Sequence, residues 1–152
     1  MRTVGVYTII KEIGHGSFAI VYKASSPDGG TFAIKTVPKS KLNKKLAENL
    51  ETEISILQGV SHPHIVQLFH VLKSETEIHL IMEYCSMGDL AIFIKRRSDS
   101  SSQNLRTLLA GPWGGLCEMA VRDFLGQISS ALEFLRSKSL IHRDLKPQVT
   151  FL

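Results

Sequence analysis

The six residues His142-Arg143-Asp144-Leu145-Lys146-Pro147 place a carboxylate and an ammonium group two positions apart, just after a long amphipathic stretch. Asp144 can accept the proton of a hydroxyl nucleophile, and Lys146 can neutralise the charge that grows on a transferred phosphoryl group. The competing interpretation is a surface ion pair, which the length of the string disfavours. Asp144 and Lys146 are therefore candidate catalytic residues, and the chemistry that they suit is transfer of a phosphoryl group to a hydroxyl.

A glycine-rich segment near the N-terminus is the second feature that could take part in binding or catalysis. Gly14 and Gly16 lie between two β-branched stretches, and Ala19 and Val21 follow them. Glycines let the backbone approach phosphates without interference from a Cβ atom. A Gly-x-Gly turn is also common in ordinary hairpins. The segment is neither a Rossmann fingerprint, because no helix follows it, nor a P-loop, because no Gly-Lys-Ser/Thr occurs.

Lys35 lies inside the apolar, strand-like segment 31–37. A lysine in such a segment is costly to bury unless it is paired. Glu53 is the candidate partner because it borders the apolar face of the next helical stretch, and Glu48 and Glu51 are the alternatives. The competing interpretation is a lysine on the solvent face of an edge strand.

Another strand-like segment ends in Met82-Glu83-Tyr84-Cys85. The backbone N–H and C=O groups of an extended connector can pair with the edge of an adenine. Asp89 follows at the start of a helical stretch, where it either caps the helix or bonds a nucleotide ribose. Both interpretations of Asp89 stand at this point.

These residues need a sheet and helices to position them. Period-two and β-branched patterns predict five strands, at residues 7–13, 19–24, 31–37, 65–72 and 78–84. Apolar residues at steps of three or four predict helices at 44–60, with Asn43 as the N-cap, and at 89–97 and 118–138. A surface loop is expected at 98–117. The fold class is α+β, with an antiparallel five-stranded sheet and one helix in residues 1–85 and the start of a helical region in 86–152.

Composition narrows the classes of protein that fit. The chain has 152 residues, 43% of them hydrophobic and 21% charged, which suits one globular domain. A net charge of +4, without an aromatic and basic groove pattern, gives no support for a nucleic-acid partner. Cys85 and Cys117 lack metal-site spacing, so we expect reduced thiols in a cytosolic protein. No apolar run approaches the roughly 18 residues of a membrane span, so no transmembrane segment is expected.

The order of these motifs resembles that of a protein kinase. A glycine-rich hairpin, a strand lysine, a helix glutamate, a connector, a long helix and HRDLKP follow one another over nearly the whole chain. Lysine at position 146 is similar to the serine/threonine kinases. The resemblance is strongest to the autophagy-initiating kinases, the fungal autophagy-related protein 1 group, in KSKLNKKLAENLETEISIL, HPHIVQL, IMEYCSMGDLAIFIKRR and ALEFLRSKSLIHRDLKPQ.

The resemblance implies a kinase N-lobe at 1–85 and the start of a C-lobe at 86–152. The C-lobe part would hold a hinge helix, the loop insertion at 98–117, the long helix at 118–138 and a catalytic loop at 140–149. The implied activity is transfer of the ATP γ-phosphate to serine or threonine hydroxyls of protein substrates. Autophagy regulatory subunits would be partners, and the location would be the cytoplasm with recruitment to the preautophagosomal membrane.

ATP and Mg²⁺ are the cofactors that the resemblance implies. Lys35, held by Glu53, would contact the phosphates, and the backbones of Glu83 and Cys85 would contact adenine. Asp144 would be the catalytic base and Lys146 its electrostatic helper. The full set of residues expected around the nucleotide is Ile13, Gly14, Gly16, Val21, Ala33, Lys35, Glu53, Met82, Glu83, Cys85 and Asp89.

Several positions depart from the family pattern. Ala19 replaces the third glycine of the loop, and Val149 stands where the family has an asparagine that holds magnesium. Hard cations need oxygen ligands, which valine lacks. The sequence reaches Leu152 without a DFG aspartate, an activation loop or an APE segment, so the kinase domain is expected to be incomplete.

We expect from these departures that this chain does not phosphorylate proteins. An altered reading frame or a retained intron would account for the tail VTFL. The alternative to a kinase is a non-catalytic fragment that binds a nucleotide or a partner protein.

Overall fold

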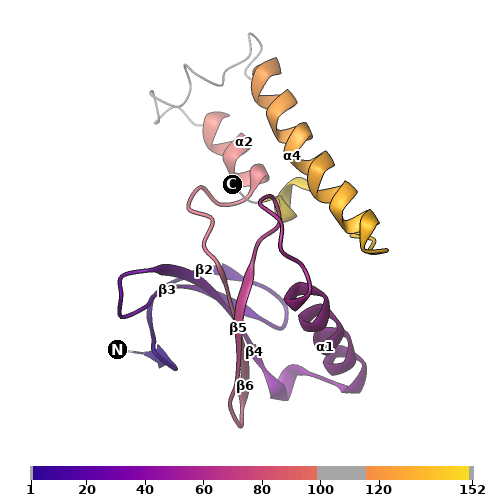
Figure 1. Cartoon of the computed structure of the whole chain (residues 1–152). Helices are drawn as coiled ribbons and strands as arrows, with labels where there is room; N and C mark the ends of the chain where they lie inside the picture. The colour runs from indigo at the N-terminus through magenta and orange to yellow at the C-terminus, as the bar shows by residue number, and fades with distance from the viewer. Residues whose placement is uncertain (1, 99–115, 151–152) are drawn as a thin grey trace. The chain divides into compact units, whose positions relative to one another are not determined.

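The chain divides into two compact units, which are described separately. The computed structural model describes residues 2–98 and 116–150 (Figure 1). The first unit holds Met1–Ser61 and Ile65–Tyr84, and the second holds His62–His64 and Cys85–Leu152. Within the described residues, no helix is long and apolar enough to cross a membrane.

A six-stranded antiparallel sheet forms the frame of the first unit, with the strand order β1-β2-β3-β4-β6-β5. The five strands expected from the sequence are confirmed, and three of them, β2, β3 and β4, form the expected meander. The strands are β1 (Thr3–Val4), β2 (Tyr7–His15), β3 (Ile20–Ser25), β4 (Thr31–Pro38), β5 (Leu68–Lys73) and β6 (Glu77–Glu83).

The additional strand, β1, was not predicted because two residues are too short to show an alternating pattern. It pairs with the start of β2 through a tight turn at Gly5-Val6. Gly5 has a φ of 56°, a conformation that glycine adopts at little cost. The turn therefore folds the N-terminal residues back onto the sheet.

The start of β5 was predicted three residues too early, at 65 instead of Leu68. Apolar residues continue through Ile65 and Val66, but the backbone N–H of Gln67 donates to the carboxylate of Glu83 at 3.2 Å instead of to a strand carbonyl. The regular ladder therefore begins only at Leu68, which pairs with Met82.

Helix α1 (Lys44–Gln58) covers one face of the sheet. Asn43 is the N-cap, as predicted, because its side chain accepts the N–H of Leu46 at 2.9 Å. Leu50 and Ile54 point into the core, where they pack with residues of β4, β5 and β6. The short helix η1 (Lys39–Lys41) connects β4 to α1. The spacing of about one turn between these two apolar residues thus sets which side of α1 faces the sheet.

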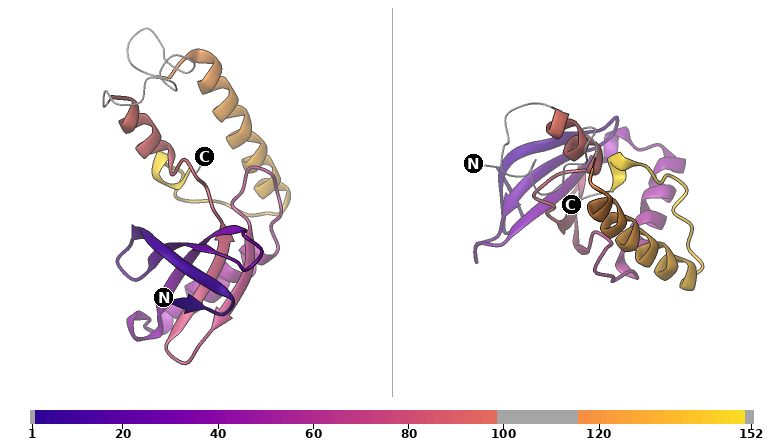
Figure 2. Two further views of the ribbon diagram at one scale, coloured as in Figure 1. Left: turned by 90° about the vertical axis from the view of Figure 1, so that its left-hand side faces the viewer. Right: turned by 90° about the horizontal axis from the view of Figure 1, so that it is seen from above.

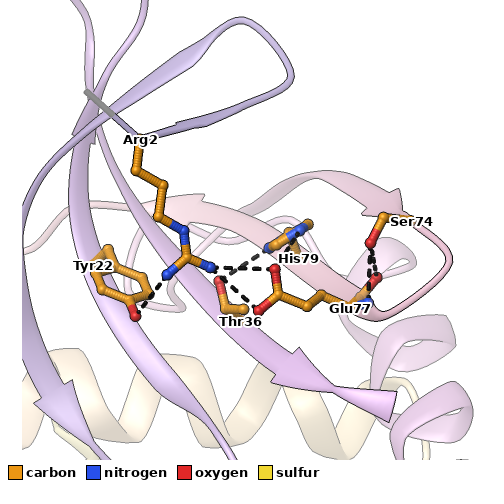
Figure 3. A network of polar contacts seen from close by, with 6 residues as sticks. All are labelled: Arg2, Tyr22, Thr36, Ser74, Glu77 and His79. Carbon is orange, nitrogen blue, oxygen red and sulfur yellow. Dashed lines mark hydrogen bonds and ion pairs between the residues drawn. The ribbon is translucent and has the colours of Figure 1, made fainter. Parts of the chain in front are cut away.

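The opposite face of the sheet is covered by the N-terminal residues. Val4 and Tyr7 are buried there against Ala24, Ile34 and Ile81. On the same side Arg2 contacts residues of two strands (Figure 3). Its guanidinium donates to Tyr22 Oη and to both carboxylate oxygens of Glu77, each at 3.2 Å. Arg2 therefore links the chain before β1 to β3 and β6.

A buried polar pair lies beside this link. His79 Nδ1 and Thr36 Oγ1 are 3.0 Å apart, and both residues are buried (Figure 3). Burial lowers the pKa of His79 below its ordinary value, and this effect outweighs the opposing influence of the Glu77 carboxylate. The histidine is therefore held in its neutral form within the sheet.

The second unit is helical. It contains α2 (Leu90–Ser98), α4 (Glu118–Ser137) and the short helix η2 (Pro147–Val149). Phe93 of α2 and Phe124 of α4 meet edge to face, with ring centroids 6.2 Å apart, and the two helices lie side by side (Figures 1 and 2). The N–H of Leu90 donates to the carbonyl of Thr150 at 2.7 Å, which joins α2 to the segment after η2. Most of the predicted loop at 98–117 lies outside the described residues.

Candidate nucleotide site and catalytic loop

Strand pairing brings most of the predicted nucleotide residues of the first unit to one face of the sheet. Val21 is paired with Lys35, and Ala33 with Met82. Directly paired residues of an antiparallel sheet point to the same side, and Ala33 and Lys35 are two positions apart on β4. All four therefore share the face that α1 covers.

Lys35 reaches from this face to α1. Its Nζ lies 2.8 Å from Oε1 of Glu53. The lysine side chain is 23% exposed and that of Glu53 46%. An ammonium group that is largely withdrawn from water needs an anionic partner, and the ion pair meets that need while it fixes the direction of the lysine.

The structure also decides between the alternative partners. Glu51, two residues before Glu53, pairs instead with Lys73 of β5 at 2.7 Å. Glu48 lies more than a turn before Glu53, and its carbonyl accepts the hydroxyl of Thr52. Glu53 is thus the partner of Lys35, as the sequence pattern favoured.

The glycine-rich segment forms the connection between β2 and β3. Gly14 is paired with Val21, and the N–H of Gly16 donates to the carbonyl of Ala19 at 2.8 Å. Neither glycine has a positive φ. A Cβ atom added to Gly14 would come no closer than 3.6 Å to Val21. Such a distance is an ordinary van der Waals contact, so the fold itself does not demand glycine at position 14.

Ile13 lies at an irregular point of β2. The register shifts between Glu12 and Gly14, so Ile13 is the extra residue of a β-bulge. Its side chain is exposed. An exposed apolar side chain beside the glycine-rich turn is available for contact with the flat face of a base.

The end of β6 holds the predicted connector residues. The N–H of Glu83 donates to the carbonyl of Gln67 at 2.9 Å. Lys23 Nζ lies 4.7 Å from the centre of the Tyr84 ring, a cation–π contact. The carbonyl of Cys85 accepts the N–H of Gly88 at 3.3 Å. Sequence reasoning missed the parts played by Gln67 and Lys23, because neither belongs to a motif.

Asp89 caps α2. Its Oδ1 accepts the N–H of Ile92 at 2.7 Å, and its carbonyl accepts the N–H of Phe93 at 2.9 Å. Of the two interpretations of this residue, the hydrogen bond to Ile92 therefore supports the N-cap. A contact with a ribose stays a prediction.

Asp144 and Lys146 meet in the second unit. Lys146 Nζ lies 2.7 Å from Oδ2 of Asp144, and the Asp144 side chain is 64% exposed. Arg143 between His142 and Asp144 has a φ of 65°. This left-handed conformation costs a residue other than glycine roughly 1–3 kcal/mol and is concentrated at functional sites. The strained residue thus directly precedes an aspartate whose side chain is largely exposed.

Residue 149 is the position at which the kinase pattern has a magnesium ligand. Val149 occupies the end of η2, and its N–H donates to the carbonyl of Lys146 at 3.0 Å. Its side chain offers no oxygen. Among residues 2–98 and 116–150, no group of three or more His, Cys, Asp and Glu side chains is arranged to hold a metal ion.

The predicted residues fall into one group in each unit. The first unit unites the glycine-rich turn, the Lys35–Glu53 pair and the end of β6. The second unit holds Asp144 with Lys146, and also Cys85 and Asp89.

Comparison with known proteins agrees with these motifs. The serine/threonine-protein kinase atg1 of Aspergillus clavatus is 53% identical over 152 residues, which cover 96% of this chain and 16% of the relative. The atg1 kinase of Penicillium rubens has the same identity and coverage. The ATG1 kinase of Kluyveromyces marxianus is 51% identical over 93% of this chain and 18% of its own length. The chain thus spans less than a fifth of these curated relatives. A family model described as "Protein kinase domain" matches residues 7–152, so the chain belongs to the protein kinase family.

Proposed function

We propose that this chain carries the ATP site and the catalytic loop of a serine/threonine protein kinase that acts in the initiation of autophagy. The parent protein would phosphorylate serine or threonine hydroxyls of protein substrates and assemble with autophagy regulatory subunits. It would act in the cytoplasm and be recruited to the preautophagosomal membrane. The printed names of the relatives support this choice among kinases.

The observation that carries the proposal is the ion pair between Lys35 Nζ and Glu53 Oε1 at 2.8 Å. In protein kinases a strand lysine that pairs with a helix glutamate must be in place for activity. Here the pair lies on the sheet face that also presents Val21, Ala33 and Met82. Lys35 would hold the α- and β-phosphates, and the apolar side chains would cover the base.

ATP, when bound, supplies the phosphoryl group that is transferred. Asp144 would take the proton from the hydroxyl group of the substrate. Because Oδ2 of Asp144 pairs with Lys146, we assign Oδ1 to that proton. Lys146 would stabilise negative charge near the oxygen that attacks. These two residues would thus combine general-base catalysis with electrostatic stabilisation.

We propose further that the described residues bind a nucleotide without efficient transfer. The observation in favour is Val149, at the position where the kinase pattern has a metal-binding asparagine. Each 1.36 kcal/mol of lost transition-state stabilisation slows a reaction about tenfold. The loss of an oxygen ligand would therefore reduce the rate strongly while leaving the contacts of Lys35 intact.

Titration calorimetry with ATP tests the nucleotide site, and Lys35→Met is the decisive variant. A hydrogen bond to a charged group contributes about 1.5–3 kcal/mol, so the variant should bind about 10- to 100-fold more weakly. Lys73→Met is the matched control, since Lys73 also joins a strand to α1 through a glutamate, at 2.7 Å. Equal losses in both variants would mean that Lys35 only supports the fold.

An assay of phosphorylation of a generic protein substrate tests the proposal that the chain does not transfer the phosphoryl group efficiently. We expect no transfer above the level of an Asp144→Asn variant. A rate that depends on Mg·ATP and disappears in Asp144→Asn would show instead that the chain is a competent kinase.

A further inference from the structure

Glu83 and Gln67 exchange two hydrogen bonds at the end of β6. The N–H of Glu83 donates to the Gln67 carbonyl at 2.9 Å. In return the N–H of Gln67 donates to Oε2 of the Glu83 side chain at 3.2 Å. The Gln67 side chain takes no part in this exchange, because its Nε2 donates to the carbonyl of Leu68 at 3.1 Å.

The exchange differs from a regular antiparallel ladder in the oxygen atom that accepts the N–H of Gln67. Two residues that form a hydrogen-bonded pair normally exchange both bonds between their backbones. At this position the Gln67 N–H would meet the backbone carbonyl of Glu83. The side-chain carboxylate has taken that place, so the backbone carbonyl oxygen is released from the ladder.

The direction of the released carbonyl also follows from strand geometry. In an extended strand the N–H and C=O groups of one residue face the same neighbour. The N–H of Glu83 faces Gln67 on the β5 side, so its carbonyl does not turn toward β4. The oxygen is therefore an acceptor at the point where β6 ends and the connector begins.

We infer that the Glu83 carboxylate is a positioning group that keeps the carbonyl oxygen of the same residue available to the exocyclic amino group of adenine. The inference rests on the proposed nucleotide site, in which the backbone of Glu83 contacts adenine, and adds to it a role for the Glu83 side chain. Adenine presents an amino group at C6, whereas hypoxanthine presents an oxygen there. A carbonyl oxygen accepts a hydrogen bond from the first and repels the second.

The test compares ATP with inosine triphosphate, which differs from it at this edge of the base. The affinity of each nucleotide is measured by titration calorimetry on the chain and on Glu83→Ala. The intact chain should prefer ATP by about tenfold, because a bound base covers the carbonyl oxygen and an acceptor then left without its hydrogen bond has a cost of that order. In Glu83→Ala the carbonyl should return to the Gln67 N–H, and the preference should fall to about one to threefold.

Two further variants separate positioning from general stability. Glu83→Gln keeps an acceptor oxygen at the same reach and should retain the preference. Gln67→Ala removes only a side chain outside the exchange and should behave like the intact chain. If Glu83→Ala shows no cooperative thermal transition, Glu83→Met replaces it, since methionine has a similar length and no oxygen.

The outcomes distinguish a failure of this inference from a failure of the proposed nucleotide site. An unchanged preference in folded Glu83→Ala, or equal affinities in the intact chain, overturns the inference and leaves the nucleotide site standing. A chain that binds neither nucleotide overturns both. A reduced preference with an unchanged melting temperature supports the inference, because a merely structural role would lower the melting temperature and leave the ratio of affinities the same.

Discussion

Lys35 of β4 and Glu53 of α1 form an ion pair at 2.8 Å, parallel to a second strand-to-helix pair between Lys73 and Glu51 at 2.7 Å. The two pairs differ in burial, since the Lys35 side chain is 23% exposed and that of Lys73 50%. Both lysines project from the sheet face that α1 covers, but Lys35 is paired directly with Val21, whereas Lys73 lies on the outer strand β5. Their comparison separates a binding role from a role in the fold.

Glu53→Gln should weaken ATP binding about tenfold, because the lysine loses the carboxylate that directs it and a hydrogen bond to a charged group contributes about 1.5–3 kcal/mol. The free energy of unfolding should change by less than about 1 kcal/mol, as is usual for partly exposed pairs. Calorimetry and urea denaturation measure the two effects. Glu51→Gln is the control and should leave the affinity for ATP unchanged. Similar affinities in the two variants would contradict the assignment of Glu53.

Arg2→Ala should lower the free energy of unfolding of the first unit by about 0.5–1 kcal/mol, through loss of an exposed ion pair and a cation–π contact. Arg2 reaches Glu77 at 3.2 Å and lies over the Tyr22 ring at 5.1 Å. Urea denaturation measures the change. Lys11→Ala on the neighbouring strand β2 is a control with an exposed cation. An equal effect in both variants would mean that Arg2 does not hold the N-terminal residues on the sheet.

The stability of the sheet should fall as the pH drops below about 6.5, the ordinary pKa of histidine. Burial lowers the pKa of His79 in the folded state, so the unfolded chain binds the proton more readily. Below the unfolded pKa, acid therefore favours unfolding, until the folded pKa is also passed. One such group gives a slope of at most about 1.4 kcal/mol per pH unit.

Urea denaturation from pH 7.5 to 5 measures this slope, and His79→Gln is the comparison. Glutamine keeps polar atoms near Thr36 and does not titrate. We expect the variant to be less stable at pH 7.5 and to show a shallower dependence on pH. Parallel curves for the two proteins would show that His79 is not the source of the pH dependence.

Asp89→Ala should destabilise the second unit by about 1 kcal/mol, the usual contribution of an N-cap. The side chain accepts the N–H of Ile92 at 2.7 Å. Asp89→Asn retains the cap and should be nearly as stable as the intact chain. Thermal denaturation followed by circular dichroism measures both variants. If ATP affinity falls in Asp89→Asn while stability holds, the ribose contact gains support over a role in capping alone.

Val149→Asn should make ATP binding more dependent on magnesium. The substitution places an amide oxygen at the position where the kinase pattern has a metal ligand. Val149 is half-buried in η2, so Val149→Thr provides a control of similar size. The ratio of ATP affinities with and without Mg²⁺, measured by calorimetry, should rise in the asparagine variant. An unchanged ratio would mean that residue 149 does not face the phosphates.

The amino-acid sequence by itself determined the elements and the local motifs. The alternation along 31–37 and the helical spacing of Leu50 and Ile54 are set by which side of an element is buried, and that information is local. Asn43 could be predicted as a cap for the same reason, since a cap contacts the helix that follows it. The order of the motifs was then enough to indicate the family.

The tertiary structure decided the contacts between residues far apart in the sequence. Glu48, Glu51 and Glu53 are chemically equivalent, and only the rotation of α1 on the sheet selects Glu53 for Lys35. The Glu83 carboxylate, and not the backbone carbonyl of that residue, accepts the N–H of Gln67. This choice depends on where the residue before β5 lies relative to the end of β6. These contacts depend on how the elements pack, because a shift of one residue in the register changes every partner. They could not be predicted from a local pattern in the sequence.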